Sequence, residues 1–162
     1  MQTEAYARAL ISYHAEITPN VDAELSLSLR LRRQDVILRD QPAELWCVVE
    51  EQALRRPIGD SGLMGEQLGH LLTMTERPNI TVQIIPQGVG LHPALQGAFY
   101  LLRFGDDWRV AYEETRRSAY YYDAPEAIED YERVMNHLRH LALSPKRSRS
   151  LISQVKKEVT ST

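Results

Sequence analysis

The sequence predicts an α+β fold, with a mixed sheet of about five strands framed by N- and C-terminal helices. Three observations lead to this prediction. Runs of β-branched and apolar residues, such as Ile80–Ile85, fit the pleated surface of a strand. Apolar residues at helical spacing recur before and after the strand-rich centre. A strand, a helix and a strand follow one another between Ala43 and Ile85, which indicates a right-handed crossover and a parallel strand pair.

Helical patterns dominate the first 40 residues. Apolar side chains share one face from Thr3 to Ala15, which predicts the first helix. Asn20 or Asp22 is suited to cap a second helix that runs to about Arg39, because a short polar side chain accepts a hydrogen bond from the first turn. This helix is rich in arginine, which we interpret as a solvated face or a surface for a partner's carboxylates.

Strands and short helices follow. Ala43–Glu50 has an apolar centre and predicts an interior strand, and Glu51–Arg56 predicts a short helix ended by Pro57. Asp60 or Ser61 caps the next helix. The remaining predicted elements are, in chain order, a helix at 62–76, strands at 80–85, 98–104, 108–113 and 118–122, and helices at 125–143 and 146–158.

Three further expectations concern these later elements. The strands at 98–104 and 108–113 are expected to form a hairpin. Asp123 is expected to cap the helix that starts at Pro125. Residues 156–162 are expected to be frayed.

Composition narrows the class of protein. A chain of 162 residues, 43% hydrophobic and 25% charged, is most simply one globular domain spanning residues 1–162. Its net charge of −3 provides no basic field that would attract nucleic acid or an acidic membrane. No apolar stretch approaches the roughly 18 residues that span a bilayer, and no secretory signal is visible. The lone Cys47 excludes an internal disulfide, fits a reducing cytoplasmic location, and has the apolar neighbours of an inert buried thiol.

A loop of roughly ten residues around His92 separates two predicted strands, and it is longer than the usual hairpin connection. Pro86 ends the first strand, and several glycines and Pro93 follow. Long loops that carry a histidine between buried strands often form binding sites. The loop is therefore the first place where a functional site is expected.

Polar residues at strand ends and in this loop are the candidates for a pocket. No phosphate-binding loop, nucleophile elbow or metal-ligand spacing is present, so we expect no metal and no cofactor. Glu51 and Arg55 have the spacing of a helical ion pair, and they are either such a pair or part of a charged wall. The predicted ligand-binding residues are Glu51, Arg55, His92, Gln96, Tyr112 and Glu114.

A cluster of aromatic residues and a possible acid–base pair complete the candidates. Tyr120–Tyr122 sends hydroxyls to both faces of a strand, as an aromatic binding wall or as strand packing with hydrated tips. His92 could exchange a proton near neutral pH with Glu51 or Glu114 as its carboxylate partner. These three residues are the catalytic candidates.

Several motifs resemble, in order, the C-terminal domain of unknown function of actinobacterial helix-turn-helix regulators of the xenobiotic-response-element type. The first is Gln2–Leu10, which is similar to the segment LQTEAYARAL that opens that domain. The further matches cover nearly the whole chain: Arg30–Gln34, Val49–Gly59, Met64–Leu68, Arg77–Pro86, Gly90–Leu95, Tyr112–Thr115 and Ala142–Ser144.

The resemblance implies a cytoplasmic regulatory domain, often encoded beside a small partner protein in an antitoxin-like arrangement. The family's DNA-binding module precedes the matched region, and no helix-turn-helix lies within this chain, so we expect no direct binding of nucleic acid. The chain is then either an isolated effector domain or a stand-alone relative. The family supplies no catalytic residues to carry over.

Three functional hypotheses follow. The leading one is a non-catalytic effector or protein-interaction domain, with a small partner protein or a small-molecule effector and a possible homodimer formed through the terminal helices. The alternative is a cofactor-free enzyme or binding protein of specialised metabolism that uses His92 and a glutamate in acid–base chemistry. The third, DNA binding by the arginine-rich helices, requires salt-dependent affinity for a duplex.

Overall fold

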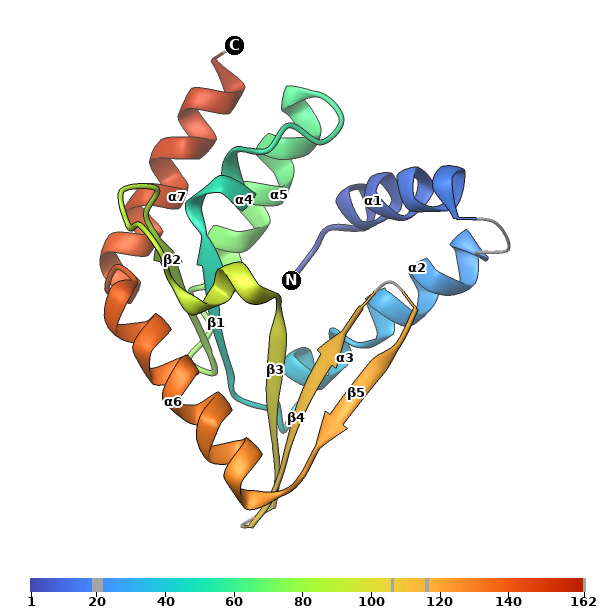
Figure 1. Cartoon of the computed structure of the whole chain (residues 1–162). Coiled ribbons are helices and arrows are strands. Elements are labelled where there is room, and N and C mark those ends of the chain that lie inside the picture. The colour runs from blue at the N-terminus through green and yellow to red at the C-terminus, as the bar shows by residue number, and fades with distance from the viewer. Residues whose placement is uncertain (19–21, 106, 116, 162) are drawn as a thin grey trace. The chain divides into compact units, whose positions relative to one another are not determined.

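The computed structural model describes residues 1–18, 22–105, 107–115 and 117–161, and it confirms the α+β class with five strands (Figure 1). The strands are divided between two sheets, of two and three strands, instead of one mixed sheet. The chain forms two compact units. The first unit comprises residues 1–86 and 143–162, and the second unit comprises residues 87–142.

The first unit contains the predicted parallel pair. Strand β1 (Leu45–Glu50) pairs with β2 (Ile80–Ile85) in parallel, with Leu45 opposite Ile80 and Glu50 opposite Ile85. The crossover between them contains α4 (Glu51–Arg55) and α5 (Ser61–Met74), and Asp60 caps α5 by accepting a hydrogen bond from Leu63 N at 2.8 Å. The expected strand–helix–strand order is therefore confirmed.

Helix α7 (Pro145–Thr160) completes this unit by packing against α5 and β2 (Figure 1). Its buried Ser148 accepts a hydrogen bond from Ile84 N at 2.9 Å, which satisfies a backbone donor of β2. The helix includes residues 156–160, where fraying was expected. The helix continues to Thr160 because Val155 is fully buried and Val159 packs against the core.

The N-terminal helices differ from the expectation at one break. Helix α1 (Glu4–Ile17) is capped by Thr3, and Asp22 caps α2 (Ala23–Arg32); the alternative cap, Asn20, lies outside the described residues. The single helix predicted to Arg39 is wrong, because a turn separates α2 from α3 (Asp35–Leu38). Gln34 in that turn bonds the backbone N–H and carbonyl of Gln2, at 3.1 and 3.0 Å.

The second unit is a sheet with one helix on it. It consists of η1 (Pro93–Gln96), β3 (Phe99–Phe104), β4 (Trp108–Glu114), β5 (Ala119–Tyr122) and α6 (Pro125–Leu141). The strands are antiparallel in the order β3–β4–β5, which confirms the hairpin. The Asp123 cap is wrong: the N-cap is Ala124, whose methyl group accepts no hydrogen bond, and Pro125 opens the helix.

No helix among the described residues has the length and apolar character needed to cross a membrane.

Candidate functional site: an uncovered aromatic face

The six predicted ligand-binding residues are divided between the two units. Glu51 and Arg55 belong to the first unit. His92, Gln96, Tyr112 and Glu114 belong to the second. The geometry of each group is therefore described within its own unit.

Glu51 and Arg55 form an ion pair that extends to a third residue. Arg55 Nε donates to a Glu51 carboxylate oxygen at 2.7 Å, and Arg55 Nη1 donates to Glu158 Oε2 at 2.5 Å. Glu51 is only 8% exposed, so this is no ordinary solvated helix pair. Hydrogen bonds with Glu158 and then Glu51 raise the pKa of Arg55, and the bond with Arg55 lowers the pKa of Glu158. The trio links α4 to α7.

The thiol of Cys47 lies in the same unit, on β1. It forms no disulfide. Burial raises the pKa of the Cys47 thiol, which keeps it in the protonated, poorly nucleophilic form. This favours the predicted inert thiol over a reactive one.

His92 and Gln96 lie at the two ends of the short helix η1 in the long loop: His92 precedes it and Gln96 is its last residue. The half-buried His92 precedes η1, and its backbone carbonyl accepts a hydrogen bond from Leu95 N at 3.1 Å. Gln96 is the last residue of η1 and is exposed. In the same loop Leu91 is 94% exposed. The loop thus displays an apolar side chain beside the predicted polar ones.

Tyr112 belongs to a ladder of three tyrosines that crosses the sheet. The strand register places Tyr100 on β3 opposite Tyr112 on β4, and Tyr112 opposite Tyr121 on β5. The ring centroids of Tyr100 and Tyr112 are 5.7 Å apart, and those of Tyr112 and Tyr121 are 4.9 Å apart. Such tilted contacts at this separation are favourable aromatic pairs. Glu114, two residues after Tyr112, shares this face of β4.

The ladder is part of a larger surface, here called the aromatic face. Because side chains alternate along a strand, every second residue of each strand contributes to it. Phe104 and Trp108 stack at its hairpin end, with ring centroids 4.7 Å apart. Trp108 is 59% and Tyr121 69% exposed. Its members are the exposed Tyr100, Leu102, Phe104, Trp108 and Tyr121, together with the half-buried Tyr112 and the buried Val110.

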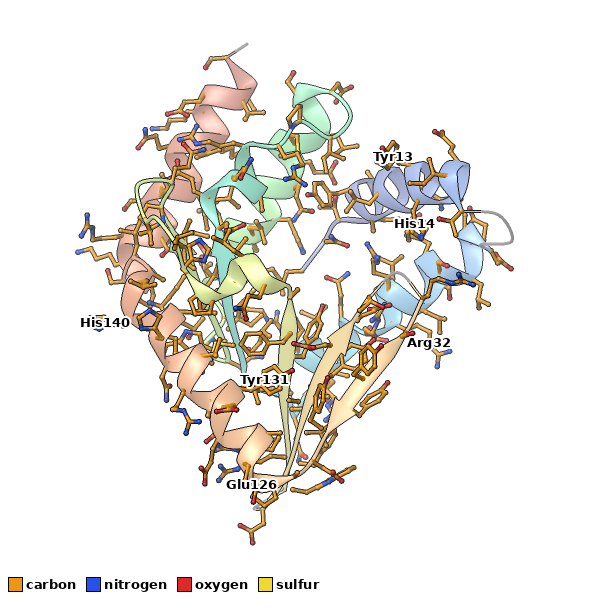
Figure 2. The ribbon with its side chains drawn as sticks, viewed as in Figure 1. Tyr13, His14, Arg32, Glu126, Tyr131 and His140 are labelled. Carbon is orange, nitrogen blue, oxygen red and sulfur yellow. The ribbon has the colours of Figure 1, made fainter. Side chains whose placement is uncertain are left out.

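The opposite face of the sheet is covered by α6. Figure 2 shows Tyr131 reaching from α6 toward the sheet, where its ring lies 5.2 Å from that of Phe99 and 5.6 Å from that of Tyr122. Burial, followed by hydrogen bonding with Glu113, raises the pKa of Tyr131 well above its ordinary value. The Tyr131 phenol therefore remains protonated and acts as a hydrogen-bond donor in the packing of α6, not as a base.

Charge around the aromatic face is negative. The exposed Asp107 stands in the turn before Trp108, and the exposed Glu114 ends β4. Over the whole second unit, six arginines face nine aspartates and glutamates, a formal charge of −3. Within the described residues, no group of three or more His, Cys, Asp or Glu could hold a metal ion. The arrangement suits apolar contact and stacking, bordered by carboxylates.

Sequence reasoning found part of this surface. It placed Tyr112 and Glu114 in a site and considered Tyr120–Tyr122 as an aromatic wall, but of these three tyrosines only Tyr121 lies on the aromatic face. It missed Tyr100, Phe104 and Trp108. The alternation of β3 and β4 was the available signal, because it puts these rings on one side of the hairpin.

Comparison with known proteins gives a family but no relative of known function. Residues 1–154 match the model of a family described as a domain of unknown function, DUF5753. Searches of curated proteins and of solved structures found no match.

Proposed function

The chain belongs to the DUF5753 family of domains of unknown function, and we propose that it is a protein-interaction domain of a transcriptional regulator. The observation that carries the proposal is the aromatic face, which α6 leaves uncovered. Tyr100, Phe104, Trp108 and Tyr121 are 55%, 46%, 59% and 69% exposed. At roughly 200 Å² for an aromatic side chain, about 450 Å² of these rings is open to solvent.

An exposed apolar patch of this size is near the largest found on ordinary monomers, and such patches often mark binding surfaces. Aromatic residues also supply most of the energetic hot spots of protein interfaces. The aromatic face has the composition expected for the centre of an interface. The exposed rings of the aromatic face make up about half of the roughly 800 Å² that each protein buries in a standard interface. The binding partner therefore also contacts residues around this face.

Charge identifies the kind of partner. Two copies of the second unit would each bring a formal charge of −3, and repulsion between them disfavours a homodimer through this face. The same charge disfavours nucleic acid, although bases stack on aromatic platforms. A different protein with an apolar centre and a basic rim would complement Trp108 and Tyr121, with Asp107 and Glu114 at the edges.

The resemblance to helix-turn-helix regulators supplies the biological setting of the proposal. In that setting the domain is cytoplasmic and antitoxin-like, and its partner is the small protein encoded beside it. The domain itself does not bind DNA directly. The alternative, a cofactor-free enzyme using His92 with Glu114 or Glu51, stays a prediction that the sequence motivates.

The test compares the two faces of the β3–β4–β5 sheet. The double variant Trp108→Glu with Tyr121→Glu should bind the purified product of the neighbouring gene at least about thirty-fold more weakly than the wild type. This factor corresponds to the loss of one strong hot spot of an interface. Titration calorimetry measures the affinity. Tyr120→Glu is the matched control, since Tyr120 is 47% exposed on the opposite face of β5, and it should change the affinity less than threefold.

Two results would overturn the proposal. One is a wild-type protein that binds no product of its neighbouring genes. The other is equal loss of affinity in the Tyr120→Glu control and the double variant. Circular dichroism establishes that each variant is folded, which is expected because all three side chains are substantially exposed.

A further inference from the structure

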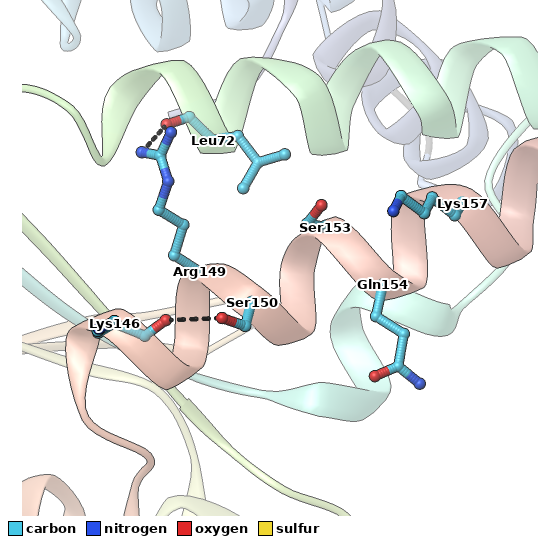
Figure 3. A pocket seen from close by; sticks show the side chains of 7 residues that line it. All are labelled: Leu72, Lys146, Arg149, Ser150, Ser153, Gln154 and Lys157. Atoms are coloured by element: carbon cyan, nitrogen blue, oxygen red, sulfur yellow. Dashed lines mark hydrogen bonds between the residues drawn. The ribbon is translucent and has the colours of Figure 1, made fainter.

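A basic groove runs along α7 in the first unit, where it faces α5 (Figure 3). Its volume is about 570 Å³, within the range of ligand sites. Figure 3 shows Arg149 reaching from α7 to Leu72 of α5, with Ser153 pointing to the same side of α7. The residues that line this basic groove are Leu72, Lys146, Arg149, Ser150, Ser153, Gln154 and Lys157.

Arg149 is a fixed part of the groove wall. Its guanidinium donates to Leu72 O at 3.1 Å, Thr75 Oγ1 at 2.9 Å and Glu76 Oε1 at 2.5 Å. These bonds join α7 to the C-terminal end of α5. Most of its donors are therefore used within the protein, and the guanidinium is not arranged as a fork for a phosphate.

Lys146 and Lys157 mark the two ends of the groove. Eleven residues separate them on one helix, which places their Cα atoms about 16 Å apart along the axis. Ile152 and Val155 are buried on the opposite side of α7, so the side that carries the two lysines is turned away from the core. Among the described residues that line the groove there is no carboxylate, so neither ammonium is neutralised from the groove wall.

The first turn of α7 reinforces the positive potential. It contains Lys146 and no acidic residue, although acidic side chains are the ones that stabilise this positive end of a helix. Ser150 and Ser153 add hydroxyl groups between the two lysines. A groove with an ammonium at each end and hydroxyls between them complements an extended ligand that has two negative charges.

We propose that the basic groove binds an acidic peptide segment in extended conformation, with two carboxylates about five residues apart. An extended chain covers about 16 Å in five residues, which matches the separation of Lys146 and Lys157. Each carboxylate has a single negative charge, which one lysine neutralises, whereas a phosphate group has a charge of about −1.5 to −2 at pH 7. The Ser153 hydroxyl would pair with the peptide backbone, and the Ser150 hydroxyl, which donates to Lys146 O at 3.2 Å, would act as an acceptor.

Nucleic acid fits the groove poorly. Its phosphates are more closely spaced than the two lysines, and no aromatic side chain lines the groove to stack on a base. This inference goes beyond the proposed function, because it concerns another unit and does not depend on the aromatic face.

The test uses the full chain and two six-residue peptides. One has Asp at positions 1 and 6 with Gly and Ser between them, and the other has the same composition with its Asp residues adjacent. Titrations followed by amide NMR shifts should show binding of the first peptide at Ser150 and Ser153, and about tenfold weaker binding to Lys146→Ala with Lys157→Ala at low salt. Arg147→Ala is the matched control, because it removes one exposed charge of the same helix outside the groove.

The outcomes separate cleanly. Selective binding of the spaced peptide, with loss in the double lysine variant and retention in Arg147→Ala, supports the proposal. Equal binding of both peptides, equal loss in Arg147→Ala, tighter binding of tripolyphosphate, or no shifts at Ser150 and Ser153 overturns it. None of these results depends on Trp108 or Tyr121, so failure here leaves the proposed interaction domain intact.

Discussion

The core of the first unit and the aromatic face of the second differ in how far their apolar side chains are buried. In the first unit, Leu68 and Ile152 of the helices α5 and α7 and Ile84 of β2 are at most 1% exposed. In the second, α6 covers one face of the sheet, while Trp108 and Tyr121 on the other face are more than half exposed. Apolar burial is the main favourable contribution to folding. The buried core thus stabilises the first unit, whereas the second unit exposes apolar surface at some cost in stability.

Two buried polar side chains of the first unit have hydrogen-bond partners. The amide of the buried Gln83 accepts from Trp46 Nε1 at 2.7 Å and donates to Leu143 O at 2.9 Å. The buried Ser148 hydroxyl accepts from Ile84 N and donates to Leu143 O at 3.2 Å. These bonds tie the start of α7 to the sheet, so both sides of the core are held in place.

The largest expected effect comes from breaking the first core. Ile152→Ala should lower the free energy of unfolding by about 2–5 kcal/mol, because it leaves a cavity among fully buried side chains. Leu102→Ala on the aromatic face should cost about 1 kcal/mol or less, since Leu102 is already 39% exposed. Urea unfolding measures both.

The two tryptophans allow the unfolding of each unit to be followed separately. Trp46 lies in β1 and Trp108 in β4, so variants that retain one of them report on one unit at a time. Ile152→Ala should shift the transition seen by Trp46. Equal destabilisation by Ile152→Ala and Leu102→Ala would contradict the distinction between the units.

A smaller effect is expected where α5 and α7 approach most closely. A Cβ at Gly65 would lie 2.6 Å from Thr160 Cγ2, whereas one at Gly69 would meet only the mobile Lys156 Nζ, at 2.9 Å. Overpacking costs about 1–3 kcal/mol, and removing a helical glycine returns about 0.5–1 kcal/mol. Gly65→Ala should therefore destabilise the protein by about 1 kcal/mol, and Gly69→Ala should stabilise it slightly.

The urea midpoint distinguishes the two glycines. Thr160→Ser removes the clashing methyl group and should restore the stability of Gly65→Ala. A Gly65→Ala variant more stable than the wild type would show that α7 moves away from α5 at little cost, and that this contact is looser than the distances indicate.

Local patterns were sufficient for most of the fold, and long-range partners account for the errors. The strand–helix–strand order predicted the parallel pair, and the turn between two successive strands predicted the β3–β4 hairpin. The break after α2 could not be predicted, because Gln34 bonds the backbone of Gln2, 32 residues away. Alternation along β3 and β4 defines two faces of the sheet, but the sequence does not say which of them α6 covers.

The same limit applies to the candidate site. The spacing of Glu51 and Arg55 indicated either an ion pair or a charged wall, and the structure contains the ion pair. The spacing of Tyr112 and Glu114 predicts a shared face of a strand. Glu158 could not be added to the ion pair, because it lies 103 residues from Arg55 in the sequence. Helix α7 continues through residues 156–160 for the same reason, because Val155 and Val159 pack against the core.

The smallest expected effect is the pH dependence of the link between α4 and α7. The hydrogen bond with Arg55 lowers the pKa of Glu158 in the folded state, so its contribution to stability is present above the unfolded value of about 4.3 and is lost as pH falls through the folded value. The stability difference between wild type and Glu158→Gln, from urea midpoints, should therefore be largest near neutral pH and vanish in acid. The difference should also disappear in an Arg55→Gln background. If it persisted there, Arg55 would not be the partner that stabilises the charged carboxylate of Glu158.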